Sequence, residues 1–262
     1  MKRCRSLSWP RKSIVIAALA LGSQACSPAT QPVTTRFALD PLPSLAPTAS
    51  PATLRFYVSD LHMVNAHGQA TPVRLTAAPP YQDERTALVS LPGDDESGNT
   101  VVHGTVPRGD YVHLEFLLGI PFARNHGNPL QAAPPLDRPA MFWAWQSGHK
   151  FLRLDLGNAW SFHLGSTGCH STSAVRPPQD ECRRPNLARI RLPAAVATDG
   201  QIEVDLGALI AAVNPTTDEN CMGSYADADT CRRVLDALGL DAGTGRCLAD
   251  CRGQRVFRAA RR

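Results

Sequence analysis

Tryptophan, histidine and cysteine residues occur close together in the middle of this chain. Trp143 and Trp145 lie one residue apart, and His163 and Cys169 follow in the same stretch. An indole can be oxidised, whereas imidazole nitrogen and sulfur are ligands that copper and zinc prefer. Side chains of these types at this spacing indicate transition-metal chemistry rather than hydrolysis.

The motifs of common hydrolases and nucleotide-binding proteins are absent from the sequence. It contains no His-Glu-x-x-His pair, no Gly-x-Ser-x-Gly turn and no glycine-rich phosphate loop. The sequence is still compatible with a Ser-His-Asp triad formed by residues that are distant in sequence. With four methionines and no Met-rich run, a copper chaperone built on thioether ligands is disfavoured.

The same residues also have a purely structural interpretation. At positions i and i+2 of an extended segment, Trp143 and Trp145 point to the same face and would pack into a core. His126 lies in a loop beside Asn125, and His163 lies on a short aromatic strand. Histidines in such places are more often structural or exposed than metal ligands. Composition alone favours this second interpretation.

Residues 1–25 have the pattern of an export signal, with a basic start, the apolar stretch 14–21 and small residues before Cys26. The apolar stretch is too short to span a bilayer as a helix, and no later segment is apolar enough. Cys26 is a candidate for lipidation and outer-membrane anchoring. Ser23 stands where lipoprotein signals usually carry Leu, so a soluble exported protein is the alternative. We expect the periplasm or the outer-membrane surface.

Six cysteines remain once Cys4 leaves with the signal and Cys26 is set aside. An even number in an oxidising compartment predicts three disulfides, for which counting alone allows about 15 pairings. Short loops favour Cys169–Cys182, Cys221–Cys231 and Cys247–Cys251. A zinc site at the last pair is a weaker interpretation, because no second pair has zinc-finger spacing.

The formal net charge of +4 gives no indication of a nucleic-acid partner. Part of the excess lies in the signal and part in the C-terminal arginines. No basic stripe with interleaved aromatic residues is present, so we expect no nucleic-acid binding.

The pattern of the remaining chain predicts a mainly β domain. Residues 26–52 are rich in Pro, Ala and Thr, which is typical of a tether. From 53 to 262, short alternating runs separated by turns predict an antiparallel β-sandwich or barrel with long loops, stapled by disulfides. A short C-terminal helix is expected over 227–238. The strand-like runs are 53–59, 86–91, 100–105, 111–118, 150–156, 188–192 and 201–206. The two long connections, where a site is expected, are 121–148 and 165–186.

Several of these segments resemble one known family, the MbnP-like proteins, also described as metallo-mystery pair four-Cys motif proteins. The resemblance runs from residue 54 to about 258, in order, and its tryptophan and His-Leu-Gly segments are specific. The matching segments are 54–60, 116–122, 125–126, 141–151, 163–169, 182–186 and 221–222 with Cys231.

The resemblance implies a β-rich exported protein that binds copper through histidines, beside a tryptophan oxidised to kynurenine. The oxidant is a partner, a di-haem enzyme of the MauG type, so the chain itself is expected not to be an enzyme. The implied copper ligands are His126 and His163, and either Trp143 or Trp145 would be modified. Neutral imidazoles suit copper. The alternatives are a structural or binding β-sandwich at the cell surface without metal, and a secreted enzyme with an unrecognised site.

The chain also departs from the family pattern. The segment before residue 54 is Pro-rich, whereas family members usually have an additional strand there, and Cys247 and Cys251 look like an added pair. His149 stands where the family usually has Tyr. This histidine is a possible additional site residue or a replacement for a phenol.

Overall fold

A computed structural model describes the backbone of most of the domain. The predicted signal peptide 1–25 and the lipidation candidate Cys26 lie outside the described residues. These residues are 29–40, 52–91, 98–173, 175–198, 200–223, 225 and 227–260.

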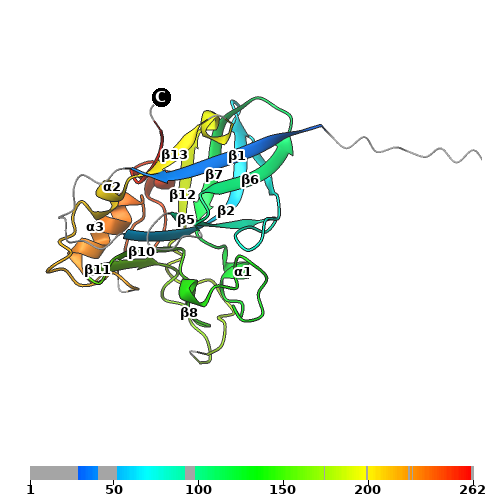
Figure 1. Cartoon of the computed structure of the whole chain (residues 1–262). Helices are drawn as coiled ribbons and strands as arrows, with labels where there is room; N and C mark the ends of the chain where they lie inside the picture. Colours follow the sequence, from blue (N-terminus) through cyan, green and yellow to red (C-terminus); the bar gives the residue numbers. More distant parts are fainter. Residues whose placement is uncertain are drawn as a thin grey trace, which may run out of the picture.

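Two β-sheets form the body of the molecule (Figure 1). The first has the strand order β14-β13-β1-β6-β4, in which β1 pairs with β6 antiparallel and with β13 parallel. Its strands are β1 (Thr30–Leu39), β4 (Arg74–Leu75), β6 (Val101–Pro107), β13 (Gln201–Val204) and β14 (Phe257–Ala259).

The second sheet has the order β11-β10-β2-β7-β12, and β3 and β5 also pair with β2. All of its pairs are antiparallel among the residues described. Its strands are β2 (Ala52–Asn65), β3 (Ala70–Pro72), β5 (Thr86–Leu91), β7 (Tyr111–Leu118), β10 (Leu152–Leu156), β11 (Trp160–Leu164) and β12 (Ala188–Pro193). A separate hairpin joins β8 (Phe142–Ala144) to β9 (Gly148–His149).

Phenylalanines from both sheets meet in the core. Phe37 of β1 packs edge-to-face on Phe56 and Phe116 of the second sheet, with ring centroids 5.3 and 6.0 Å apart. Phe257 of β14 contacts the same two rings at 5.4 and 5.9 Å. Because side chains of a strand alternate between its two faces, each sheet presents one apolar face to the other. The predicted β-sandwich is confirmed.

The prediction of a tether over 26–52 is wrong for β1. This strand alternates in burial, with Val33, Thr35 and Phe37 facing inward, and it hydrogen-bonds to two neighbouring strands. The Pro- and Thr-rich composition hid this period-2 pattern. The additional strand that family members usually have before residue 54 is therefore present in this chain as β1, although its Pro-rich sequence did not predict it. Residues 26–28 and 41–51 of that segment lie outside the described residues.

Short helices cover the ends of the sandwich. The predicted C-terminal helix is confirmed as α3, which lies near β11 in Figure 1, while α1 and β8 lie below the sheets in this view. No helix in the described part of the chain is sufficiently long and apolar to cross a membrane. The helical elements are α1 (Phe122–Asn125), η1 (Pro139–Met141), η2 (Ala194–Ala197), α2 (Leu206–Ile210), α3 (Asp229–Ala237) and η3 (Leu248–Cys251).

The three predicted disulfides are confirmed, and each closes a short loop. Cys169–Cys182 spans 13 residues, Cys221–Cys231 spans 10 and Cys247–Cys251 spans 4. The second disulfide ties α3 to the edge of the sandwich, because Cys221 accepts a backbone hydrogen bond from His163 of β11.

Candidate metal centre

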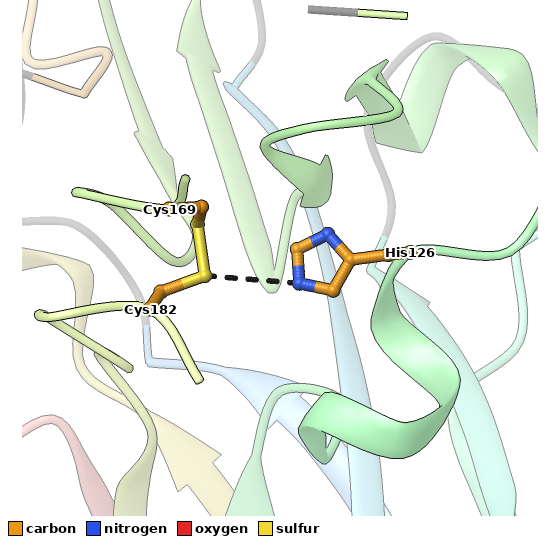
Figure 2. A group of neighbouring side chains, drawn as sticks. All are labelled: His126, Cys169 and Cys182. Atoms are coloured by element: carbon orange, nitrogen blue, oxygen red, sulfur yellow. Dashed lines mark hydrogen bonds between the residues drawn. A yellow bond between two sulfur atoms is a disulfide. The ribbon is translucent and has the colours of Figure 1, made fainter. Parts of the chain in front are cut away.

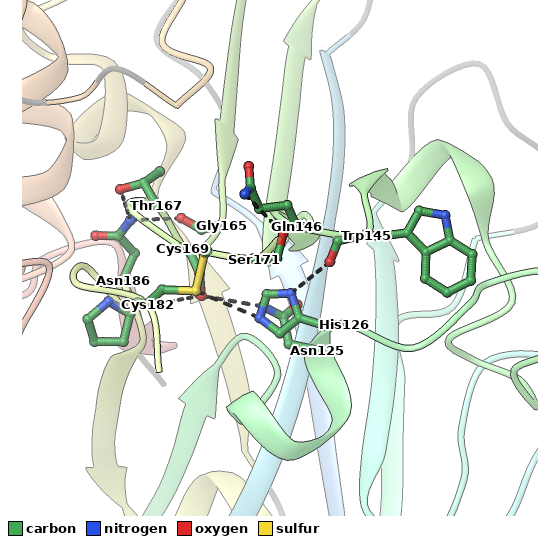
Figure 3. The surroundings of a disulfide bond; sticks show 12 residues. Asn125, His126, Trp145, Gln146, Gly165, Thr167, Cys169, Ser171, Cys182 and Asn186 are labelled. Carbon is green, nitrogen blue, oxygen red and sulfur yellow. Dashed lines mark hydrogen bonds between the residues drawn. A yellow bond between two sulfur atoms is a disulfide. The ribbon is translucent and has the colours of Figure 1, made fainter. Parts of the chain in front are cut away.

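The two long loops predicted to carry a site meet at His126. This residue follows α1 and is 7 % exposed. One ring nitrogen contacts the hairpin that carries the tryptophans, and the other faces the disulfide of the second loop (Figures 2 and 3). Residues far apart in sequence are thereby assembled around one imidazole.

Hydrogen bonds define the protonation of the His126 ring. Its Nδ1 lies 3.2 Å from the backbone carbonyl oxygen of Trp145, and because a carbonyl only accepts, Nδ1 carries the proton. The lone pair therefore sits on Nε2, which lies 3.3 Å from Asn125 Nδ2 and 3.7 Å from Cys182 Sγ. Burial lowers the pKa of His126, against a smaller raising effect of the Trp145 carbonyl. The ring is neutral and has the form in which imidazole binds metals.

Asn125 holds the hairpin against α1. Its side chain is fully buried, and its Oδ1 accepts a hydrogen bond from the backbone N–H of His149 at 2.8 Å. Gly148 precedes this histidine with a φ of +75°, and a Cβ there would lie 2.6 Å from Asn125 Oδ1. Only glycine fits a backbone that is both left-handed and this close to another side chain.

His149, the possible additional site residue, lies in the scaffold around Asn125. Its Nδ1 faces the Asn125 carbonyl at 2.6 Å and its Nε2 faces the Leu136 carbonyl at 3.1 Å. Burial lowers the pKa of His149, although both carbonyls oppose this. With a carbonyl oxygen facing each nitrogen, neither nitrogen is open to a metal ion in this arrangement.

His163 lies on β11, beside a carboxylate of the neighbouring strand. Its Nε2 is 2.8 Å from Asp155 Oδ1, which also accepts from Ser161 Oγ at 2.8 Å. Burial raises the pKa of Asp155, but these hydrogen bonds and the nearby charge of Arg153 outweigh it, and the pKa lies well below its ordinary value. A carboxylate that accepts from one ring nitrogen leaves the other as the ligand atom, as is typical of metal-bound histidines.

The structure does not group His163 with His126 in a cluster of ligand atoms. Among the residues described, the potential ligand atoms that lie within 4.8 Å of one another belong to His126, Cys169 and Cys182. The two sulfurs form a disulfide and are not thiolates, so in this state the cluster offers one good ligand, the His126 nitrogen. That both histidines share one ion stays a prediction.

The two tryptophans differ in their surroundings. Trp143 lines a pocket of about 330 Å³, together with Cys169 and the half-exposed Met222. Its ring lies on Gly165, where a Cβ would come within 2.5 Å of the indole. The Trp145 indole points away from His126, and only its carbonyl takes part in the site (Figure 3).

Sequence reasoning missed two parts of this site. It did not identify Asp155 as the partner of His163, although Asp155 pairs directly with Ser161 on the adjacent strand. The sequence contained a signal for this pair, because residues two apart on a strand share a face. The polar residues of the two strands alternate with apolar ones: Arg153, Asp155, Ser161 and His163. It also did not place Met222 beside Trp143, which only the folded loops bring together.

These features define a class of protein: a disulfide-linked β-sandwich whose loops hold a neutral histidine beside a tryptophan hairpin. A family model described as MbnP matches residues 21–223, and the chain belongs to the MbnP family. Among solved structures, MbnP from Methylosinus trichosporium is similar, with a TM-score of 0.69 and 26 % sequence identity. The match covers 88 % of this chain and 98 % of that one. No curated protein matches.

Proposed function

We propose that this chain is an exported copper-binding protein, not an enzyme, that serves in copper homeostasis or acquisition. The observation that carries the proposal is the buried, neutral His126 ring, whose Nδ1 donates to the tryptophan hairpin and whose Nε2 lone pair faces the Cys169–Cys182 loop. Imidazole nitrogen suits copper, and burial keeps the ring in its binding form. Membership of the MbnP family supports the same assignment.

His163 is the proposed second ligand, through Nδ1. Its Nε2 is held by Asp155, which would orient the ring and raise the basicity of the free nitrogen. Binding one ion with His126 requires the loops between them to close around the metal.

We propose Trp143 as the tryptophan that a di-haem partner of the MauG type oxidises to kynurenine. Trp143 lines the pocket beside Cys169, whereas the Trp145 indole points away from His126. Kynurenine carries an aromatic amine and a ketone where the indole had none, and these polar atoms could ligate copper or hydrogen-bond within the site.

The proposed location is the periplasm or the outer-membrane surface. The three disulfides suit an oxidising compartment. Lipidation of Cys26 would provide the membrane anchor.

Copper titration before and after contact with the di-haem partner tests this proposal. We expect a mass shift on the peptide that contains Trp143, together with tighter binding of one copper ion per chain. Trp143→Phe should lose both effects, and Trp145→Phe, the matched control, should keep them. His126→Ala and His163→Ala should each abolish tight binding, while His67→Ala at an exposed turn should not.

Unchanged copper stoichiometry in the His126→Ala, His163→Ala double variant would contradict the proposal. The chain would then be better described as a β-sandwich with a structural or binding role and no metal. A mass shift on Trp145 alone would overturn the assignment to Trp143 only.

A further inference from the structure

The disulfide beside His126 points to a second state of the same loops. We propose that a dithiol reductant converts the Cys169–Cys182 bond into a site for a soft metal ion, with both cysteine sulfurs and His126 as ligands. The inference goes beyond the proposed copper function, which concerns the oxidised chain, and shares only His126 with it.

The ligand atoms already have a suitable spacing. The sulfurs and a nitrogen of the His126 ring lie within 4.8 Å of one another, and Nε2 is 3.7 Å from Cys182 Sγ (Figure 2). Around a tetrahedral zinc ion with ordinary bond lengths, neighbouring ligand atoms are about 3.5 Å apart. Once the sulfur–sulfur bond is broken, the two thiolates must separate by about 1.5 Å to enclose an ion with the imidazole.

The backbone holds the two cysteines side by side without the disulfide. Thr167 and Arg184 form a pair of antiparallel hydrogen bonds of 2.9 and 3.0 Å, and Arg183 N–H donates to the Gly168 carbonyl at 3.2 Å. The buried Asn186 side chain adds a bond of 2.7 Å to the Gly165 carbonyl. Reduction therefore leaves the thiols adjacent instead of releasing the loop.

The imidazole is already oriented toward the sulfurs. The Trp145 carbonyl holds Nδ1, so the lone pair of His126 Nε2 points at the disulfide. Asn125 Nδ2 would have to give up its contact with Nε2, and it has another acceptor in Ser166 Oγ at 3.4 Å. An incoming ion thus leaves the Asn125 amide nitrogen with one of the two hydrogen bonds that it has now.

The disulfide is accessible from one side. Cys169 is partly exposed and lines the 330 Å³ pocket with Trp143 and Met222, whereas Cys182 is 4 % exposed. A thiolate of the reductant attacks Cys169 Sγ, the sulfur–sulfur bond breaks, and Cys182 leaves as a thiolate. The second thiol of the reductant then releases Cys169 and departs as a cyclic disulfide, so two electrons enter the protein. Metal binding displaces the remaining thiol proton to solvent.

The test uses the full chain and zinc, which has no redox chemistry of its own. The protein is reduced with dithiothreitol without oxygen, freed of reductant, and checked by alkylation and mass spectrometry for free Cys169 and Cys182. We expect it to bind one more zinc ion per chain than the oxidised protein. Cobalt in place of zinc should show thiolate-to-cobalt charge-transfer absorption.

Matched variants separate this disulfide from the other two. Cys169→Ser with Cys182→Ser should lose the additional ion, whereas Cys247→Ser with Cys251→Ser should keep it. His126→Ala should weaken zinc binding by roughly tenfold or more.

Three results would overturn the proposal: a disulfide that resists dithiothreitol in the folded protein, free thiols without extra zinc, or the same gain in the Cys169→Ser, Cys182→Ser variant. His163→Ala distinguishes the two proposals. It should abolish tight copper binding by the oxidised chain and leave the reduction-dependent zinc ion in place.

Discussion

At the residue scale, the chemistry of the site depends on which nitrogen of each histidine keeps its lone pair. Trp145 O and Asp155 each accept a hydrogen bond from one ring nitrogen, which leaves the lone pair on His126 Nε2 and on His163 Nδ1. His149 has carbonyls at both nitrogens and supports the scaffold instead. Three histidines that look alike in the sequence thus differ in which ring nitrogen is covered, because their hydrogen-bond partners come from other elements.

Acid should destabilise the protein through His126. Burial holds its folded-state pKa below the unfolded value of about 6.5, so the unfolded chain binds the proton first. The free energy of unfolding therefore falls as pH drops through that value and stops responding below the folded pKa. Urea unfolding at a series of pH values should show a shallower fall for His126→Asn than for the wild type.

The exposed His67 provides the control for this measurement. His67→Asn should keep the full pH dependence. If His126→Asn left the slope unchanged, the acid sensitivity would have to come from other groups. Copper affinity of the folded protein should decrease only as the pH falls to the lowered folded-state pKa of His126 and below it, because there the proton competes with the metal for Nε2.

At the element scale, the sequence predicted strand-like runs that are bounded by turn residues. Thr86–Leu91 and Tyr111–Leu118 were expected with the bounds that the structure has. β1 was missed because Pro32 and a run of threonines resemble a linker, while its inward pattern becomes meaningful only beside β6 and β13. Pairing between strands is a non-local property, and a single sequence does not specify it.

β1 should be essential to the sandwich. Phe37→Ala removes a ring that contacts Phe56 and Phe116 and should lower the free energy of unfolding by about 3–5 kcal/mol. Leu130→Ala, at a side chain that is 82 % exposed, should change it by less than about 0.5 kcal/mol. Denaturant unfolding measures both. A Phe37→Ala effect as small as the control would mean that β1 contributes little to the core.

At the scale of the whole molecule, the sandwich supplies a rigid frame and the disulfides fix what is attached to it. Cys169–Cys182 closes a site loop, and Cys221–Cys231 connects α3 to β11. The strand pattern predicted the fold, the cysteine spacing predicted the disulfide pairs, and the resemblance of scattered motifs predicted the family. It could not predict that His126 faces a disulfide, since that contact depends on how two loops 56 residues apart meet.

The disulfides should differ in their contribution to stability according to the length of chain they close. The loop-entropy estimate is about 3 kcal/mol for Cys169–Cys182 and about 2 kcal/mol for Cys247–Cys251, whose separations are 13 and 4 residues. Paired Cys→Ala variants, compared by urea unfolding, should follow that order, with Cys221–Cys231 between them at a separation of 10. A larger loss for the shortest loop would show that the packing of η3, rather than unfolded-chain entropy, determines the contribution of that bond.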